Sequence, residues 1–157
     1  MTIRALESRD VEAILAIQAA CPEIAQWTAW DYDRVARGEM AGWVATENSN
    51  AGAEVAAEFA GEVAGFLVAR RLSTELEILN FAVESDWRRC GIGAKLLGEA
   101  LQWAQTFQAT HAILEVRASN LAALRFYERH KFEVVGRRPR YYTVPVEDAL
   151  LLTATLT

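Results

Sequence analysis

The sequence is short of several residue types that point to particular classes of protein. Among its 157 residues are two cysteines, Cys21 and Cys90, and two histidines. No Cys-x-x-Cys pair or Cys/His cluster has zinc spacing, so no metal is expected. No window of 18 uninterrupted apolar residues occurs, which argues against a membrane-spanning segment. The first residues lack the apolar stretch of a secretory signal, so the cytoplasm is the expected compartment.

Positive charge is also scarce. The chain has 16 Lys and Arg against 21 Asp and Glu, a net charge of −5. Sequence-independent binding of nucleic acids relies on a surplus of Lys and Arg, so we expect no direct nucleic-acid partner and no membrane partner. Apolar residues make up 52% of the chain and charged residues 24%, which is typical of a globular protein. The length favours a single domain over residues 1–157.

A turn with two glycines follows a strand-like run at residues 78–83. Residues 88–97 read Arg-Arg-Cys-Gly-Ile-Gly-Ala-Lys-Leu-Leu and open a helix-like repeat of apolar residues. Glycines let the backbone come close to a ligand, because no side chain stands in the way. The first N–H groups of a helix and its dipole favour negative charge. The turn is therefore a predicted anion site, most naturally for phosphate.

The spacing of the glycines narrows the kind of phosphate ligand. The Rossmann fingerprint needs a third glycine where this chain has Leu96, and the Walker loop is also absent. The pattern that is present is Arg/Gln-x-x-Gly-x-Gly/Ala, with Arg88, Gly91 and Gly93. Taken alone, this pattern leaves an ordinary strand-to-helix turn as an open alternative.

Periodicity and turn residues predict a mixed α/β fold. We expect a largely antiparallel central sheet of about seven strands, flanked by about four helices. The expected strands are residues 2–6, 42–46, 62–71, 75–84, 111–117, 132–138 and 148–155. The first expected helix begins at an N-cap on Ser8 and ends at Pro22. Three further helices are expected over 28–37, 91–107 and 120–129. Residues 48–58 are expected to form an extended hairpin excursion.

The strand expected at 111–117 carries a charge in an unusual place. Alternation puts Leu114 and Val116 on one face, and Ile113, Glu115 and Arg117 on the other. A bare carboxylate in an apolar strand is costly. Glu115 can therefore either form an ion pair with Arg117 on the same face or serve as a general base.

Two polar residues follow this strand. Ser119 or Asn120 is a candidate N-cap for the next helix. Tyr127 lies seven residues after Asn120, so the two residues share nearly one helix face. Tyr127 can equally be a core residue whose hydroxyl is satisfied locally.

In combination, these stretches resemble the GNAT superfamily of acyl-CoA-dependent N-acyltransferases. The joint pattern is Arg88-x-x-Gly91-x-Gly93 with Glu115-x-Arg117-x-Ser119-Asn120 and Tyr127-Glu128. It is similar in particular to the RimI-type subfamily, the ribosomal-protein N-terminal alanine acetyltransferases. The resemblance covers roughly residues 62–152, including 80–83, 138–142 and 147–149, and a weaker match extends to Trp27-Thr28.

The resemblance implies a GNAT fold and a role for each matching residue. The acyl donor would be acetyl-CoA, with no metal. Its pantetheine arm would bind main-chain groups of Phe81, Ala82 and Val83, and also Asn120. Its pyrophosphate would lie against Arg88, Arg89, Cys90, Gly91, Ile92, Gly93 and Ala94. Glu115 would be the general base, acting through a water, and Tyr127 the general acid. Trp27 and Tyr141 would border the acceptor.

The activity implied by the resemblance is acetyl transfer to the N-terminal α-amine of a protein. The expected acceptor is the N-terminal alanine of a small-subunit ribosomal protein. Two alternatives stay open: a GNAT protein that acetylates a small amine or a lysine, and a partner protein that binds acyl-CoA without turnover. Residues 21–26 lack the family's apolar-Pro-Trp pattern beside the acceptor. Lys131 replaces the glycine before Phe132, at a cost of about 1 kcal/mol if its backbone is left-handed.

Overall fold

The computed structural model describes residues 1–47 and 62–156, so the excursion predicted at 48–58 lies outside the described residues. The strands are β1 (Thr2–Ala5), β2 (Ala41–Thr46), β3 (Val63–Leu72), β4 (Glu75–Val83), β5 (His111–Arg117), β6 (Glu133–Thr143) and β7 (Val146–Thr155). The α-helices are α1 (Val11–Ala19), α2 (Ala29–Ala36), α3 (Ile92–Gln105) and α4 (Leu121–Arg129), with 3-10 turns η1 (Ser8–Asp10) and η2 (Ser85–Trp87).

The strands follow the hydrogen-bonded order β1-β2-β3-β4-β5-β7-β6. The described pairs are antiparallel except β4 with β5, which run parallel over Glu75–Glu77 and His111–Ile113. The predicted mixed, largely antiparallel fold is therefore confirmed. The predicted end of β6 was wrong: β6 continues to Thr143 instead of ending at 138, because it forms a hairpin with β7 in which Thr143 pairs with Val146.

The chain divides into two compact units. Unit 1 contains Met1–Ala69 and Asn80–Ala100, and unit 2 contains Arg70–Leu79 and Leu101–Thr157. The prediction of a single domain stays a prediction. No helix within residues 1–47 and 62–156 is long and apolar enough to cross a bilayer.

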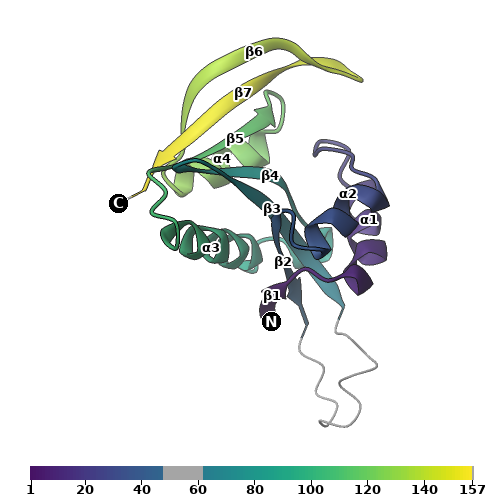
Figure 1. The fold of residues 1–157 in the computed structure, drawn as a ribbon. Helices are drawn as coiled ribbons and strands as arrows, with labels where there is room; N and C mark the ends of the chain where they lie inside the picture. The colour runs from purple at the N-terminus through teal and green to yellow at the C-terminus, as the bar shows by residue number, and fades with distance from the viewer. Residues whose placement is uncertain (48–61, 157) are drawn as a thin grey trace, which may run out of the picture. The chain divides into compact units, whose positions relative to one another are not determined.

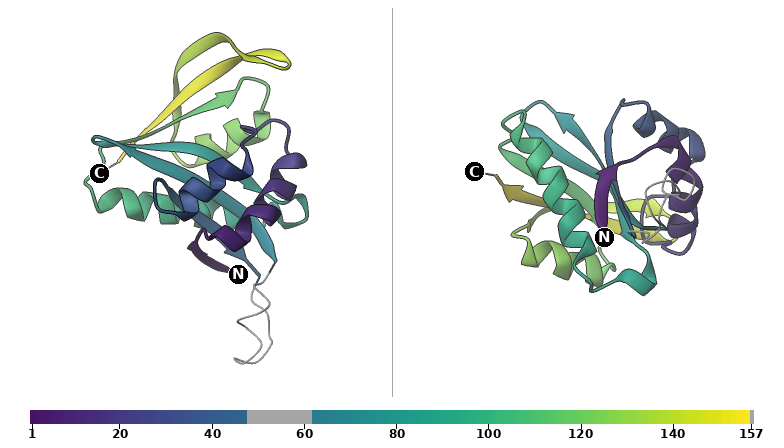
Figure 2. Two further views of the ribbon diagram at one scale, coloured as in Figure 1. Left: turned by 45° about the vertical axis from the view of Figure 1, so that its right-hand side comes forward. Right: turned by 90° about the horizontal axis from the view of Figure 1, so that it is seen from below.

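The strands of unit 1 are covered on both faces. Phe66 of β3 meets the ring of Tyr32 from α2 at 5.6 Å, whereas the neighbouring Gly65 faces Leu96 of α3. Because successive strand residues point to opposite faces, α2 and α3 cover opposite sides of β3. Figures 1 and 2 show this arrangement, with α1 beside α2.

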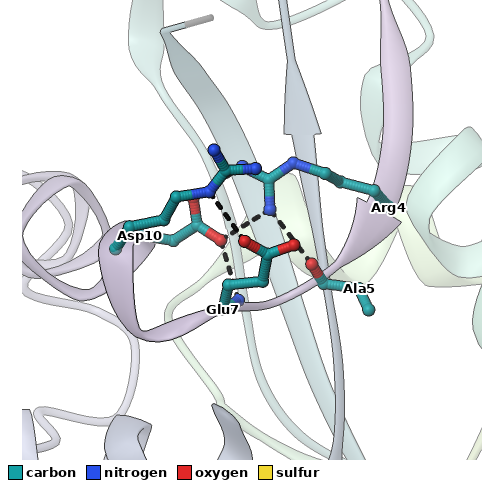
Figure 3. A network of polar contacts seen from close by, with 5 residues as sticks. Arg4, Ala5, Glu7 and Asp10 are labelled. Carbon is teal, nitrogen blue, oxygen red and sulfur yellow. Dashed lines mark hydrogen bonds and ion pairs between the residues drawn. The ribbon is translucent and has the colours of Figure 1, made fainter. Parts of the chain in front are cut away.

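A buried ion pair holds the first strand to the first helix. Two nitrogens of the Arg4 guanidinium donate to the two carboxylate oxygens of Asp10 at 2.8 and 2.7 Å (Figure 3). Asp10 also accepts the N–H of Glu7, which forms a capping box with it. The prediction that Ser8 is the N-cap was wrong: Glu7 takes that position, because the carboxylate that completes the box is Asp10.

Unit 2 contains a long hairpin and one helix beside its sheet. In β5, Ala112, Leu114 and Val116 are buried and the alternate residues are half-buried, as the alternation predicted. β7 pairs with β5 along the whole of that strand and with β6 on its other edge. Figure 1 shows α4 next to β5 and the β6–β7 hairpin extending past the end of β5.

We expect Asp10→Ala to lower the free energy of unfolding by about 3 kcal/mol, because it leaves the guanidinium of Arg4 half-buried without its carboxylate. Urea denaturation measures the change. As a matched control, Glu39→Ala breaks the exposed pair with Arg34 and should leave stability nearly unchanged. An equal effect of the two substitutions would contradict a stabilising role for the buried pair.

Candidate functional site

The glycine turn of unit 1 has the backbone geometry of an anion site. Gly91 has a φ of 81°, a backbone conformation that is unfavourable for residues with a side chain. No atom lies within 4 Å of the position that a Cβ would take, so the space beside Gly91 is open. The first helical bond of α3 runs from the N–H of Lys95 to the carbonyl of Gly91. The N–H groups of residues 92–94 therefore precede that bond and have no partner within the helix. These features fit a phosphate group.

Arg88, the first residue of this motif, folds back onto its own unit. Its Nε donates to the carbonyl of Val83 at 3.1 Å, and its Nη2 lies 3.2 Å from the Sγ of Cys21. Burial raises the pKa of the Cys21 thiol, so this group is a neutral partner for the guanidinium. Cys90 is exposed, and its Sγ lies 3.6 Å from the carbonyl of Arg88. A pyrophosphate contact by Arg88 stays a prediction.

The strand segment before the turn approaches its neighbour closely. Gly65 lies at a bulge, since it pairs with Ala45 and β2 and β3 change register between Ala45 and Thr46. A Cβ on Gly65 would come within 3.0 Å of the carbonyl oxygen of Ala82 and 3.3 Å of the Cα of Val83. Both are backbone atoms that cannot move aside. Glycine at this position therefore allows β4 to lie where residues 81–83 are expected to meet the pantetheine arm.

A buried hydrogen-bond network anchors the segment between α1 and α2. The amide of Asn80 donates to the hydroxyl of Tyr32 at 2.9 Å and to the carbonyl of Ala25 at 3.0 Å. Gln18 bonds both main-chain groups of Trp27, at 2.8 and 3.0 Å, and accepts the Tyr32 hydroxyl. Burial raises the pKa of Tyr32, which keeps its proton for this bond. The network was not predicted, because its members are far apart in the sequence.

In unit 2, Glu115 is held by the β6 hairpin. Its Oε1 lies 3.0 Å from Nε of Arg138, and its side chain keeps 26% of its surface exposed. The charge of Glu115, followed by burial and a hydrogen bond to Glu115, raises the pKa of Tyr141. The alternative ion pair with Arg117 was wrong, because Arg117 pairs with Glu147 at 3.3 Å and lies over the ring of Tyr142.

Glu115 also borders a cavity of about 270 Å³ within unit 2. Its charged lining residues are Arg70, Glu77, Glu115 and Arg138, and its other lining residues are aliphatic. The two carboxylates each have an arginine partner, since Arg70 pairs with Glu77 at 2.7 Å. A bound molecule could therefore place a polar atom against a carboxylate of the cavity and an apolar group against its aliphatic walls.

Helix α4 carries Tyr127 and is closed at both ends by specific bonds. Asn120 is the N-cap and accepts the N–H of Ala123 at 3.2 Å, so one of the two candidate caps is confirmed. At the other end, the N–H of Phe132 bonds the carbonyl of Tyr127 and the N–H of Lys131 bonds that of Glu128. This is a Schellman motif, with the rings of Phe132 and Tyr127 5.3 Å apart.

Tyr127 itself is buried, and burial raises the pKa of its hydroxyl. The group therefore keeps its proton at neutral pH. The structure places Phe81, Ala82, Val83, Trp27 and the turn residues 88–94 in unit 1. It places Glu115, Asn120, Tyr127 and Tyr141 in unit 2, where the charge of Glu115 raises the pKa of Tyr141. Their catalytic and binding roles stay predictions. Within residues 1–47 and 62–156, no group of three Asp, Glu, His or Cys could hold a metal.

A strand, a glycine turn and a helix in this order, within a mixed sheet, define an α/β protein with a candidate anion site at the turn. A family model described as Acetyltransferase (GNAT) family matches residues 11–132, and the chain belongs to this family. The resemblance noted in the sequence is thereby confirmed.

Individual relatives of the chain are also named as acetyltransferases. The chain is 34% identical over 94 residues to the [ribosomal protein bS18]-alanine N-acetyltransferase of Escherichia coli, covering 59% of this chain and 64% of that protein. It is 34% identical over 109 residues to the N-alpha-acetyltransferase daf-31 of Caenorhabditis elegans, covering 65% and 59%. The chain therefore spans less than two thirds of these relatives.

Solved structures share the fold over nearly the full chain. The crystal structure of the Escherichia coli ribosomal-protein-S18-alanine N-acetyltransferase superposes with a TM-score of 0.78 at 26% identity, covering 99% of this chain and 94% of that one. The structure of Arabidopsis thaliana NAA60 in complex with acetyl-CoA gives 0.82 at 21% identity, covering 99% and 98%. The predicted GNAT fold is confirmed.

Lys131 has a φ of 70°, the left-handed backbone that its glycine-replacing position predicted. We expect Lys131→Gly to raise the free energy of unfolding by up to about 1 kcal/mol, since glycine avoids the steric cost of that conformation. Gly38 ends α2 in the same Schellman motif with a φ of 88°. The matched reverse change, Gly38→Lys, should therefore lower the free energy of unfolding. Thermal and urea unfolding of both variants measure these changes. A lower stability of Lys131→Gly would contradict a steric cost of the left-handed backbone at Lys131.

We expect Glu115→Gln to lower the pKa of Tyr141, because the substitution removes the negative charge that disfavours a phenolate beside it. The absorbance of ionised tyrosine, titrated from pH 8 to 12 in roughly the range of an ordinary phenol, measures the shift. A parallel titration of Tyr141→Phe identifies the signal of this residue among the four tyrosines. An unchanged titration in Glu115→Gln would show that the two side chains are apart in solution.

Proposed function

We propose that this protein transfers the acetyl group of acetyl-CoA to the N-terminal α-amine of a protein. The proposed acceptor is the N-terminal alanine of a small-subunit ribosomal protein, in the cytoplasm. The observation that carries the proposal is the partly exposed carboxylate of Glu115, which borders a cavity in a chain of the GNAT family. Two relatives that carry protein N-terminal acetyltransferase names support the acceptor class.

Acyl transfer needs a neutral amine, and the ease of making one differs between acceptors. An α-amine has a pKa of about 7.7–8.0 and a lysine about 10.4. At pH 7, deprotonation therefore costs about 1 kcal/mol for the α-amine and about 4.5 kcal/mol for lysine. A single carboxylate, acting directly or through one water, suits the easier of the two. Glu115 is assigned this role of general base.

Tyr127 is assigned the role of general acid. A thiolate that leaves in an acyl transfer carries new negative charge, which a phenol can neutralise. Burial of Tyr127 keeps its hydroxyl protonated, and the edge-on contact with the ring of Phe132 and the closed end of α4 fix its side chain. The turn at residues 88–94 is assigned to the pyrophosphate of acetyl-CoA, and residues 81–83 with Asn120 to its pantetheine arm.

We expect the purified protein to acetylate a peptide that begins with alanine, with release of one thiol per acetyl group. Glu115→Gln and Tyr127→Phe should each lower kcat by about 100-fold or more, since a positioned acid or base contributes at least that factor. Glu39→Gln, a carboxylate change on the exposed face of unit 1, should leave kcat unchanged. Wild-type turnover in both site variants, each checked for an unchanged Tm, would refute the assigned chemistry.

The same assay separates the alternatives. A peptide with a blocked N-terminus and one free lysine tests for lysine acetylation, and a polyamine tests for a small-amine acceptor. Faster turnover with either would displace the N-terminal proposal. Tight binding of CoA without thiol release from any acceptor would indicate a binding protein. Mass spectrometry of ribosomal proteins from cells with and without this protein then identifies the natural acceptor.

A further inference from the structure

Strand β6 contains a bulge next to the residues that contact Glu115. Arg138 lies opposite Ala149 of β7 and Tyr142 lies opposite Glu147, so β6 makes four residue steps where β7 makes two. Within this bulge Arg140 has a φ of 52°, a conformation that costs energy for any residue with a side chain. Bulges of this kind re-aim side chains and persist when the surrounding contacts hold them.

One carboxylate holds this bulge. The Oδ1 of Asp148 accepts the N–H of Arg140 at 2.9 Å, and its Oδ2 accepts from Nη1 of Arg137 at 2.6 Å. Asp148 therefore contacts the residues on both sides of Arg138 along the strand. The hydrogen bond from Arg140 and the one from Arg137 lower the pKa of Asp148, so it is charged at neutral pH.

The bulge carries two side chains that reach Glu115. Arg138 pairs with it at 3.0 Å, and Tyr141 lies close enough for the charge of Glu115 to raise the pKa of its hydroxyl. The guanidinium of Arg138 lies 5.7 Å from the centre of the Tyr141 ring, so the two side chains also support each other. Because β7 lies between β5 and β6 in the sheet, Arg138 reaches Glu115 across an intervening strand, from the last paired residue before the bulge.

We propose that Asp148 is a positioning residue: by holding the β6 bulge it fixes Arg138 and Tyr141 against Glu115 and so sets the orientation of that carboxylate. The inference rests on the proposed function, in which Glu115 is the general base. The neighbouring Glu147 has a different task, since it accepts the N–H of Ser119 and pairs with Arg117 at the start of the segment that leads to α4.

The test uses Asp148→Ala, which removes both bonds, and Asp148→Asn, which keeps an oxygen for the N–H of Arg140 but loses the charge. We expect Asp148→Ala to lower kcat by about 10- to 100-fold, the size of effect that a small misplacement of a reacting group produces, with KM for acetyl-CoA unchanged. Asp148→Asn should fall between Asp148→Ala and the wild type. Glu39→Ala is the matched control on an exposed ion pair and should match the wild type.

Two further readouts separate positioning from a merely structural role. In Asp148→Ala the pKa of Tyr141 should fall, as in Glu115→Gln, because the phenol leaves the carboxylate; Glu77 and Arg138 are the other charged groups that act on it. In a Glu115→Gln background, Asp148→Ala should lower kcat no further, because the residues act as one unit. Additive losses would overturn the inference.

The titration needs no activity, so it decides the inference even if the proposed function fails. An unchanged pKa of Tyr141 in a folded Asp148→Ala protein would overturn the positioning role while leaving Glu115 as a candidate base. If the pKa of Tyr141 falls in Asp148→Ala but the wild-type protein shows no turnover, the positioning of Tyr141 beside Glu115 is supported and the proposed function is refuted. If Asp148→Ala does not fold, the same comparisons with Asp148→Asn decide.

Discussion

A carboxylate in the middle of an aliphatic strand must find compensation, and the residues that compensate Glu115 determine how its face of unit 2 is built. Water reaches a quarter of the side chain, and Arg138 and Tyr141 supply the remaining partners. Neither partner is on the same strand or the next one. In the proposed arrangement, the bulge in β6, with the left-handed Arg140 and its bond to Asp148, holds those two side chains in place.

The position of Tyr127, the candidate general acid, depends on how the two ends of α4 are capped. Asn120 caps the first turn, and the Schellman motif at the other end brings Phe132 onto Tyr127. Lys131 occupies the left-handed position of that motif at an energetic cost that Gly38 avoids at the end of α2. In unit 1, the buried amide of Asn80 plays a comparable role, since it ties the segment before α2 to the strand that leads into the glycine turn.

Much of the architecture was predictable, because it depends on local rules. The alternation in 111–117 predicted the two faces of β5, and the helix predicted over 28–37 is α2. The glycine spacing after residue 88 predicted the turn. Two predictions failed because a different carboxylate formed the contact: Asp10 completes a capping box with Glu7 rather than Ser8, and Glu147 rather than Glu115 pairs with Arg117.

The sequence by itself determined the order and type of the elements, the glycine turn before α3 and the GNAT family, because these depend on residue spacing along the chain. Only the tertiary structure decided which charges pair across strands, that β6 bulges between Arg138 and Tyr142, and that Asn80, Tyr32 and Gln18 share one buried network. The physical reason is that ion pairs and buried hydrogen bonds depend on distances in space. Strand register and helix packing set those distances, and no local pattern encodes them.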